Sequence, residues 1–461
     1  AYVTNSRFEH NTAVGGDANG GGLFVLGGTL TVTGTDFISN SAKGGAGAVS
    51  NVSVVMADVT FEDNYAEQFA GLGAVGTAAV LSNTNFFSNT STGSASGGAY
   101  LLGNVQITGG RYIGNTCGAG CNGGGLYVKA GTISGTLFIS NTSAGGGGGL
   151  TVSGTAATTA LTVTNAYFER NICTDSGCMG GGMYADARVA LVDTDFYSNT
   201  GGMSNYGGGG LHAIPGATIS GGIFQSNSGY RGGALSAGAG SNVTFVISGT
   251  QFLSNTASMA GTGGGAFYFG PNTGSSAILT NVYAAGNSAQ TGGAIYATRS
   301  ITVAGGVFEN NDAVDGGALA ATTNSGVRFT ISATRFLSNT GSTTGLGGGA
   351  FFFNPGANSS ALLLNVYAAN NSAKAGGALY AGKPISVTGG VYENNVAADG
   401  SGGVLYAADV ITVTDARFLN NAAAGATSNG GAIYQISGNG QIVNSLLAGN
   451  SAGTYGDGYY R

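Results

Sequence analysis

Short stretches in which apolar and polar residues alternate recur along the whole chain. Runs such as TLTVTG (29–34), ITVAGG (301–306) and ITVTDA (411–416) place Leu, Ile or Val at every second position. This period of two predicts short β-strands that each have one buried face. No stretch changes to the helical period, so the pattern predicts an all-β protein.

A second pattern, an aromatic residue followed three positions later by asparagine, divides the chain into repeats. Three copies replace the aromatic residue, at Ala284, Ala368 and Leu447. The seventeen copies give a repeat of about 27 residues, the length of one supersecondary unit. The asparagines that mark the repeats are Asn11, Asn40, Asn64, Asn89, Asn115, Asn141, Asn171, Asn199, Asn227, Asn255, Asn287, Asn311, Asn339, Asn371, Asn395, Asn421 and Asn450.

Each asparagine is followed by a glycine cluster and a third short apolar run, as in GGGLYV (123–128) and GGAIYA (292–297). A repeat therefore carries roughly three strands separated by turns. Tandem glycines would each cost about 1 kcal/mol inside a helix, and a propeller blade needs about 40 residues. The repeat predicts a single right-handed, three-sheet parallel β-helix of about 17 rungs over residues 1–461.

A longer duplication overlies the repeat. The segment GGIFQSN (221–227) matches GGVFENN (305–311), and NVYAAGNSA (281–289) matches NVYAANNSA (365–373). Both matches are offset by 84 residues, which predicts that three rungs were copied together, with residues 221–304 equivalent to 305–388.

The stacking of rungs predicts what the marker residues do. Rungs about 4.8 Å apart would place the aromatic residues in an inward stack and the asparagine amides in a hydrogen-bonded ladder. Asparagine also tolerates left-handed backbone angles, so we expect it to turn the corner itself. A metal or sugar site built on these asparagines is the disfavoured alternative.

Four cysteines occur as two close pairs in the same variable turn, two repeats apart. Cys117 and Cys121 lie in NTCGAGCNGGG, and Cys173 and Cys178 lie in NICTDSGCMGGG. We predict two local disulfides, and disulfides indicate an oxidising, extracellular setting. Free thiols and a four-thiolate zinc site are the alternatives; zinc is disfavoured because turns two rungs apart start about 10 Å from each other.

Aromatic residues also recur at the outward position of the glycine-led strands. Two interpretations stay open: stacking between rungs that stabilises the sheet, or a face for stacking sugars or packing sideways. The residues are Phe24, Tyr127, Tyr184, Tyr268, Tyr296, Phe352, Tyr380, Tyr406, Tyr434 and Tyr460.

Composition and charge exclude several classes of protein. Glycine makes up 90 of 461 residues, but there is no collagen period, and 42% hydrophobic residues argue against disorder. A net charge of −6 with scattered basic residues argues against nucleic-acid binding. No apolar run approaches the roughly 18 residues that span a bilayer, so we expect no membrane insertion.

Catalytic chemistry has little support in the sequence. The two histidines, His10 and His212, are many repeats apart, and the best carboxylate pair is Asp193 with Asp195, which we expect to share a strand. No basic residue recurs beside that pair. We therefore predict that the protein is not an enzyme and binds no cofactor.

The pairing of the aromatic–Asn motif with GGAI, at 292–295 and 430–433, resembles the repeats of chlamydial polymorphic outer-membrane proteins and related bacterial surface proteins. The resemblance covers nearly the whole chain and implies a pectate-lyase-like β-helix with an adhesive surface function. The chain departs from that family in lacking an autotransporter barrel, so self-secretion is not implied.

The two ends of the sequence suggest self-association. AYVTNSRF (1–8) aligns with the second strand of a repeat, and GDGYYR (456–461) aligns with a glycine-led strand. Neither end has a recognisable cap, and a chain that begins at Ala1 is expected to be mature or trimmed. We hypothesise a head-to-tail homopolymer whose contacts are made by Ala1, Tyr2, Val3, Tyr459, Tyr460 and Arg461.

Three functions follow from these observations. The leading hypothesis is an extracellular structural protein that forms filaments by head-to-tail stacking. The second is a cell-surface adhesin that binds cell-surface or glycan ligands. The third is a polysaccharide lyase or hydrolase on the same fold, since fold alone does not decide activity.

Overall fold

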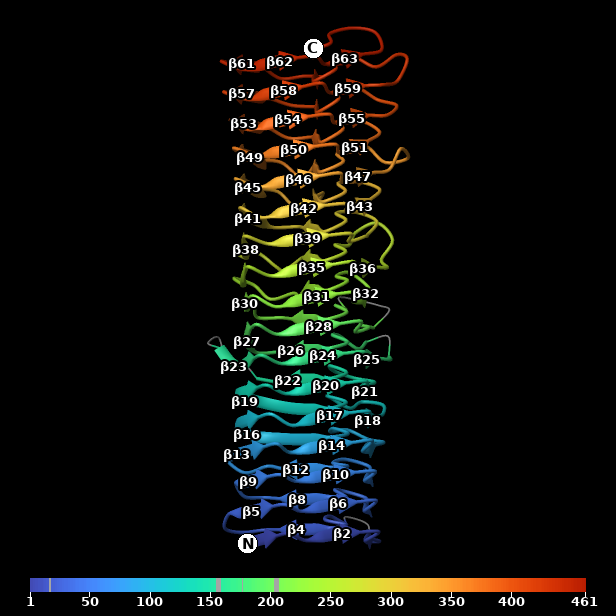
Figure 1. Cartoon of the computed structure of the whole chain (residues 1–461), viewed down its shortest axis with the longest axis vertical. Helices are drawn as coiled ribbons and strands as arrows, with labels where there is room; N and C mark the ends of the chain where they lie inside the picture. Colours follow the sequence, from blue (N-terminus) through green and yellow to red (C-terminus); the bar gives the residue numbers. More distant parts are fainter. Residues whose placement is uncertain (16–17, 155–158, 176, 203–206) are drawn as a thin grey trace. The chain divides into compact units, whose positions relative to one another are not determined.

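The protein is a parallel β-solenoid of about 16 turns, with no helix among the described residues (Figure 1). The computed structural model describes residues 1–15, 18–154, 159–175, 177–202 and 207–461. The chain divides into two compact units, Ala1–Tyr230 and Arg231–Arg461, which are described separately below. The predicted all-β, parallel β-helix class is confirmed.

A typical coil contains four short strands, one more than the roughly three predicted. In one coil of the first unit these are β8 (Ala48–Ser50), β9 (Val54–Ala57), β10 (Thr60–Glu62) and β11 (Tyr65–Ala66). The additional strand has only two residues and follows the marker asparagine. Two residues are too few to show an alternation of apolar and polar positions, so this strand could not be recognised in the sequence. Each strand pairs in parallel with its equivalent in the next coil.

The second unit repeats this arrangement. One of its coils consists of β52 (Leu379–Ala381), β53 (Ile385–Thr388), β54 (Val391–Glu393) and β55 (Val396–Ala397). Along the second strand of the coil, buried and partly exposed residues alternate. This alternation is the period of two from which the strands were predicted.

The aromatic marker residues point inward and stack from coil to coil in the first unit, as predicted. Successive ring centroids are 4.6–5.0 Å apart, and the ring planes lie within 14° of each other. The stack consists of Phe8, Phe37, Phe61, Phe86, Tyr112, Phe138, Phe168, Phe196 and Phe224.

The marker asparagines form a ladder inside each unit, from Asn11 to Asn227 in the first and from Asn255 to Asn450 in the second. The Nδ2 of each asparagine donates to the Oδ1 of the next one at 2.8–3.0 Å. Nδ2 also donates to the carbonyl of the marker residue one coil earlier, as from Asn171 to Phe138. The predicted structural role of these residues is confirmed.

One part of that prediction was wrong, because the asparagine does not itself adopt the left-handed backbone angle. The residue before it does, with φ of +51° at Ser39, +55° at Ser140 and +53° at Asn310. The amide must point into the ladder, so the chain turns at the preceding residue, which lies closer to solvent. Serine, asparagine and glycine dominate this position because they tolerate that angle at low cost.

The aromatic stack is interrupted in the second unit at Ala284 and Ala368. The coil that contains Ala368 instead carries Phe351 and Phe353 at the two inward positions of β48 (Phe351–Phe353). The coil that contains Ala284 has an equivalent pair of phenylalanines in β37 (Phe267–Phe269). In these two coils, phenylalanines on the glycine-led strand therefore fill the space that alanine leaves at the marker position, which keeps the interior close-packed.

One aromatic residue of the stack leaves a polar group unsatisfied. The hydroxyl of Tyr112 is buried and has no hydrogen-bond partner among the described residues, and burial raises its pKa far above the usual value. We expect Tyr112→Phe to raise the free energy of unfolding by about 1 kcal/mol, because an unsatisfied buried hydroxyl is costly. Urea denaturation of the variant measures this, with Phe138→Tyr as the reciprocal control; a destabilised Tyr112→Phe protein would contradict it.

Candidate functional site

The four cysteines form the two predicted disulfides, Cys117–Cys121 and Cys173–Cys178. Their Cα atoms lie 5.7 Å and 5.6 Å apart, within the normal range for a disulfide. The zinc and free-thiol alternatives are thereby excluded for these residues. Elsewhere in the described part of the chain, no cluster of three or more His, Cys, Asp or Glu side chains is placed to hold a metal ion.

The carboxylate pair is not arranged as the sequence suggested. Asp195 opens β28 (Asp195–Tyr197), whereas Asp193 lies in the preceding turn with φ of +44°, so the two do not share a strand. The Oδ1 of Asp195 accepts a hydrogen bond from the Ile223 amide at 2.9 Å. Burial raises the pKa of the Asp195 carboxyl, this bond lowers it, and the nearby Asp193 charge raises it again. The carboxylate is thus engaged in joining two coils.

The histidines are also far from forming a site. His10 is exposed and lies 3.6 Å from Glu9, while His212 is buried in β29 (Leu211–Ala213) and stacks against Tyr184 at 5.9 Å. The two histidines lie in different coils of the first unit. They cannot act on a common substrate atom, because groups that cooperate in catalysis must lie within hydrogen-bond reach of one another.

The residues predicted to make polymer contacts occupy the strand positions that the alignment gave them. In β1 (Tyr2–Thr4), Tyr2 pairs with Thr31 of a second strand, and Tyr2 is 87% exposed. In β64 (Tyr459–Tyr460), Tyr459 pairs with Ile433 of a glycine-led strand. The other members of the set are Ala1, whose amino group donates to the Thr29 carbonyl, Val3, Tyr460 and Arg461.

The outward aromatic residues stack between coils, as the first of the two interpretations expected. Several of them, including Tyr127, Tyr268 and Tyr296, are buried. Four half-exposed tyrosines of the second unit remain at the surface and are called the tyrosine column: Tyr380, Tyr406, Tyr434 and Tyr460. Neighbouring centroids in the column are 5.0, 5.2 and 5.6 Å apart.

This geometry limits what the tyrosine column can bind. Because the rings of Tyr380 and Tyr406 are nearly parallel, at 9°, their faces are turned to each other and solvent meets mainly ring edges and hydroxyls. Burial raises the pKa of both phenols, and the nearby Asp315 raises that of Tyr380 further, so both stay neutral at physiological pH. Stacking of a sugar on a ring face, the second interpretation, is therefore disfavoured within the column.

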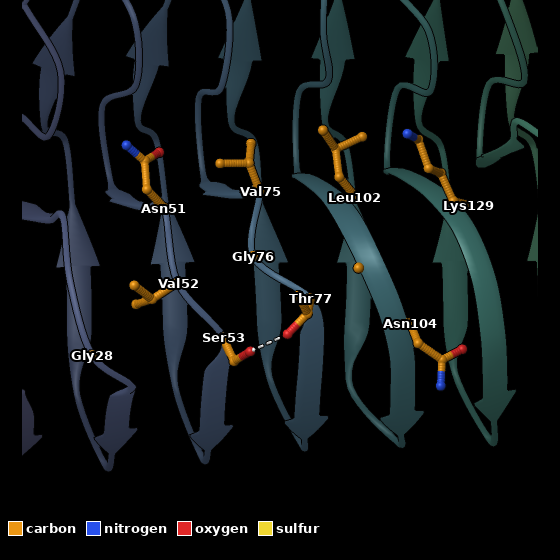
Figure 2. Close-up of a pocket in the computed structure, with 11 residues that line it drawn as sticks. Gly28, Asn51, Val52, Ser53, Val75, Gly76, Thr77, Leu102, Asn104 and Lys129 are labelled. Atoms are coloured by element: carbon orange, nitrogen blue, oxygen red, sulfur yellow. Dashed lines mark hydrogen bonds between the residues drawn. The ribbon is translucent and has the colours of Figure 1, made fainter.

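A different surface offers a more open site, which the sequence did not reveal. In the first unit a trough of about 710 Å³ runs along the corner between the first and second strands of successive coils (Figure 2). It is lined by Gly28, Asn51, Val52, Ser53, Val75, Gly76, Thr77, Leu102, Gly103, Asn104 and Lys129. No acidic residue lines it.

The trough exists because of how the corner is built. In β16 (Ala99–Thr108) and β19 (Leu126–Ser134) the first and second strands run on as one, without the break seen in earlier coils. The register shifts between Leu101 and Asn104, so that two residues of β16 face only Lys129 of β19. Such bulges redirect side chains, and this one leaves Lys129 pointing outward beside the trough.

Two rows of side chains border the trough. Figure 2 shows Asn51, Val75, Leu102 and Lys129 in one row, with one residue from each of four successive coils. The second row contains Ser53, Thr77 and Asn104, and the hydroxyls of Ser53 and Thr77 bond to each other at 3.1 Å. In the sequence, the only sign of the trough was that the turn between the first and second strands shortens in successive repeats. A change in turn length involves no characteristic residue type, so it did not indicate a binding site.

These features define a class of protein: a β-solenoid repeat protein with stacked asparagine ladders. No protein-family model, curated protein or solved structure matches the chain. In the described part of the chain no helix is both long and apolar enough to cross a membrane.

Proposed function

We propose that the protein is a non-catalytic structural component of the cell exterior whose chains associate end to end. The observation that carries this proposal is the uniformity of the contacts between coils. Within each unit, successive coils bind each other through parallel strand pairing and the asparagine ladder, and in the first unit also through stacked aromatic rings. Since the strand pairing and the asparagine ladder recur from coil to coil within each unit, a coil of a second chain can make the same contacts.

The extracellular location is supported by the two disulfides, which persist in oxidising surroundings. The absence of catalysis is supported by the engagement of Asp195 between coils and by the separation of His10 from His212. We expect no cleavage of pectin or alginate. Measurable turnover that disappears in Asp193→Ala or Asp195→Ala would contradict this part of the proposal.

In the proposed contact, the amide of Asn450 donates to the Oδ1 of Asn11 in the next chain, as it does within each unit. β64 of one chain and β1 of the next chain then form the first and second strands of one joint coil. The assembly is a heterologous, open contact, which extends into a filament instead of closing.

We expect Asn11→Leu to abolish this association while the single chain stays folded, because Asn11 is exposed and, among the described residues, its side chain bonds only to Asn40. Sedimentation velocity over a range of concentrations measures the effect. Asn104→Leu, which changes an exposed asparagine outside the ladder, is the matched control and should assemble like the unaltered protein. Equal assembly of the Asn11→Leu protein would refute the proposed contact.

A second candidate function is adhesion to a surface polymer. The observation that favours it is the trough, since asparagine and lysine side chains that make no hydrogen bond or ion pair with any described residue line an open, elongated surface. The resemblance of the repeats to those of chlamydial polymorphic outer-membrane proteins points in the same direction. Both candidate functions are compatible with one protein, because the trough and the coil ends are different surfaces.

A further inference from the structure

We infer that the trough in the first unit binds a linear, acidic polysaccharide that lies across the coils. The inference gives a ligand class to the second candidate function, adhesion, and rests on it. It is independent of the end-to-end association. Shape, periodicity and charge each contribute to the assignment.

The shape of the trough requires an extended ligand. Its lining residues come from five successive coils, from Gly28 in the first to Lys129 in the fifth. Its floor is backbone: a Cβ on Gly76 would lie 2.2 Å from the Val52 carbonyl carbon, and one on Gly103 would lie 2.5 Å from the Gly76 oxygen. At these two positions the floor has no room for a side chain.

The polar groups of the trough are available to a ligand. The side chains of Asn51, Asn104 and Lys129 make no hydrogen bond or ion pair with any described residue. The ladder asparagines, in contrast, are buried and fully bonded, as at Asn171. Free amides accept and donate hydrogen bonds at once, which suits the hydroxyl groups of sugars.

The spacing of these groups favours a glycan over a polypeptide. Equivalent side chains in successive coils recur about every 4.8 Å, the distance between paired strands. An extended polypeptide advances about 3.3 Å per residue and loses register with such a row within a few residues. A pyranose unit in a linear polysaccharide is close to one coil spacing in length, so consecutive sugars meet consecutive coils.

The charge of the trough favours a carboxylate-bearing glycan. Lys129 is exposed, and no acidic residue lines the trough. An unpaired ammonium group in this setting attracts an anion, and a uronic acid supplies one on each sugar. Val75 and Leu102 in the same row provide apolar contact for the faces of the sugar rings.

The test uses the full chain and three defined probes: polygalacturonate, neutral dextran and polyglutamate. By isothermal titration at low salt, we expect binding of polygalacturonate and no binding of dextran or polyglutamate. Lys129→Gln should weaken polygalacturonate binding about tenfold, as expected for one charged contact of about 1.4 kcal/mol. Lys43→Gln, which changes an exposed lysine in a different turn of the first unit, is the matched control and should bind normally.

A second variant tests the location independently of charge. Val75→Trp adds bulk at an exposed position of the trough and should abolish binding without unfolding the coil. Equal losses in Lys43→Gln and Lys129→Gln, or full binding by Val75→Trp, would overturn the inference. Equal binding of polyglutamate would also overturn it and would indicate a peptide ligand. Absence of polygalacturonate binding alongside normal filaments would reject the glycan site and leave end-to-end association standing.

Discussion

Asn171→Ala is expected to lower the free energy of unfolding by about 3–5 kcal/mol, one of the two largest effects we predict for a single substitution. Asn171 is fully buried, and its Nδ2 donates to Asn199 and to the Phe138 carbonyl. Its Oδ1 accepts from both the backbone and the side-chain amide of Asn141. Alanine removes these four hydrogen bonds and leaves buried groups such as the Asn141 backbone N–H without a partner, and each such group costs about 1–3 kcal/mol.

Urea denaturation, combined with hydrogen exchange to locate the affected coils, measures this loss. Asn11→Ala is the matched control, because Asn11 is exposed and its side chain bonds to one neighbour only, so we expect a loss of about 1 kcal/mol or less. Equal effects of the two substitutions would contradict the view that the ladder stabilises the interior of the solenoid.

The second large effect concerns the coil in which aromatic volume has moved. Phe353→Ala should cost about 3–5 kcal/mol by leaving a cavity, and Ala368→Phe should cost about 1–3 kcal/mol by overpacking. Both residues are fully buried, and Phe353 packs against Phe329 and Phe351 with centroids 5.6 and 5.7 Å apart.

The double variant Phe353→Ala/Ala368→Phe restores the arrangement of the preceding coil, in which Ala321 and Phe336 occupy these positions. We expect the double variant to lose at least 1 kcal/mol less unfolding free energy than the two single variants lose together, because the two changes compensate in volume. Denaturation of all four proteins completes the cycle. Strict additivity would show that the two positions do not share one packing space.

The fold could be predicted well from the sequence because each repeat forms one coil and equivalent residues stack from coil to coil. A period of two gave the strands, and the spacing of the asparagines gave the coil. The inward aromatic stack and the ladder followed from placing equivalent positions about 4.8 Å apart. The cysteine pairs were predicted correctly because the partners are four or five positions apart, a separation that one turn can close.

Other features depended on details that residue type does not encode. The left-handed angle falls at Ser39 and not at Asn40 because the ladder fixes the direction of the asparagine amide. Asp193 and Asp195 were expected on one strand, but a turn separates them. The trough arises from the lengths of turns in neighbouring coils, and only their stacking brings Asn51, Asn104 and Lys129 to one surface.

Helical image analysis of the purified protein by electron microscopy tests end-to-end association most directly. The proposal predicts filaments of many chains in which the axial repeat of about 4.8 Å continues across each junction between chains. It also predicts that Asn450 of one chain and Asn11 of the next occupy consecutive positions of one ladder. Particles that remain single chains at all concentrations, or filaments whose junctions lack this ladder, would contradict it.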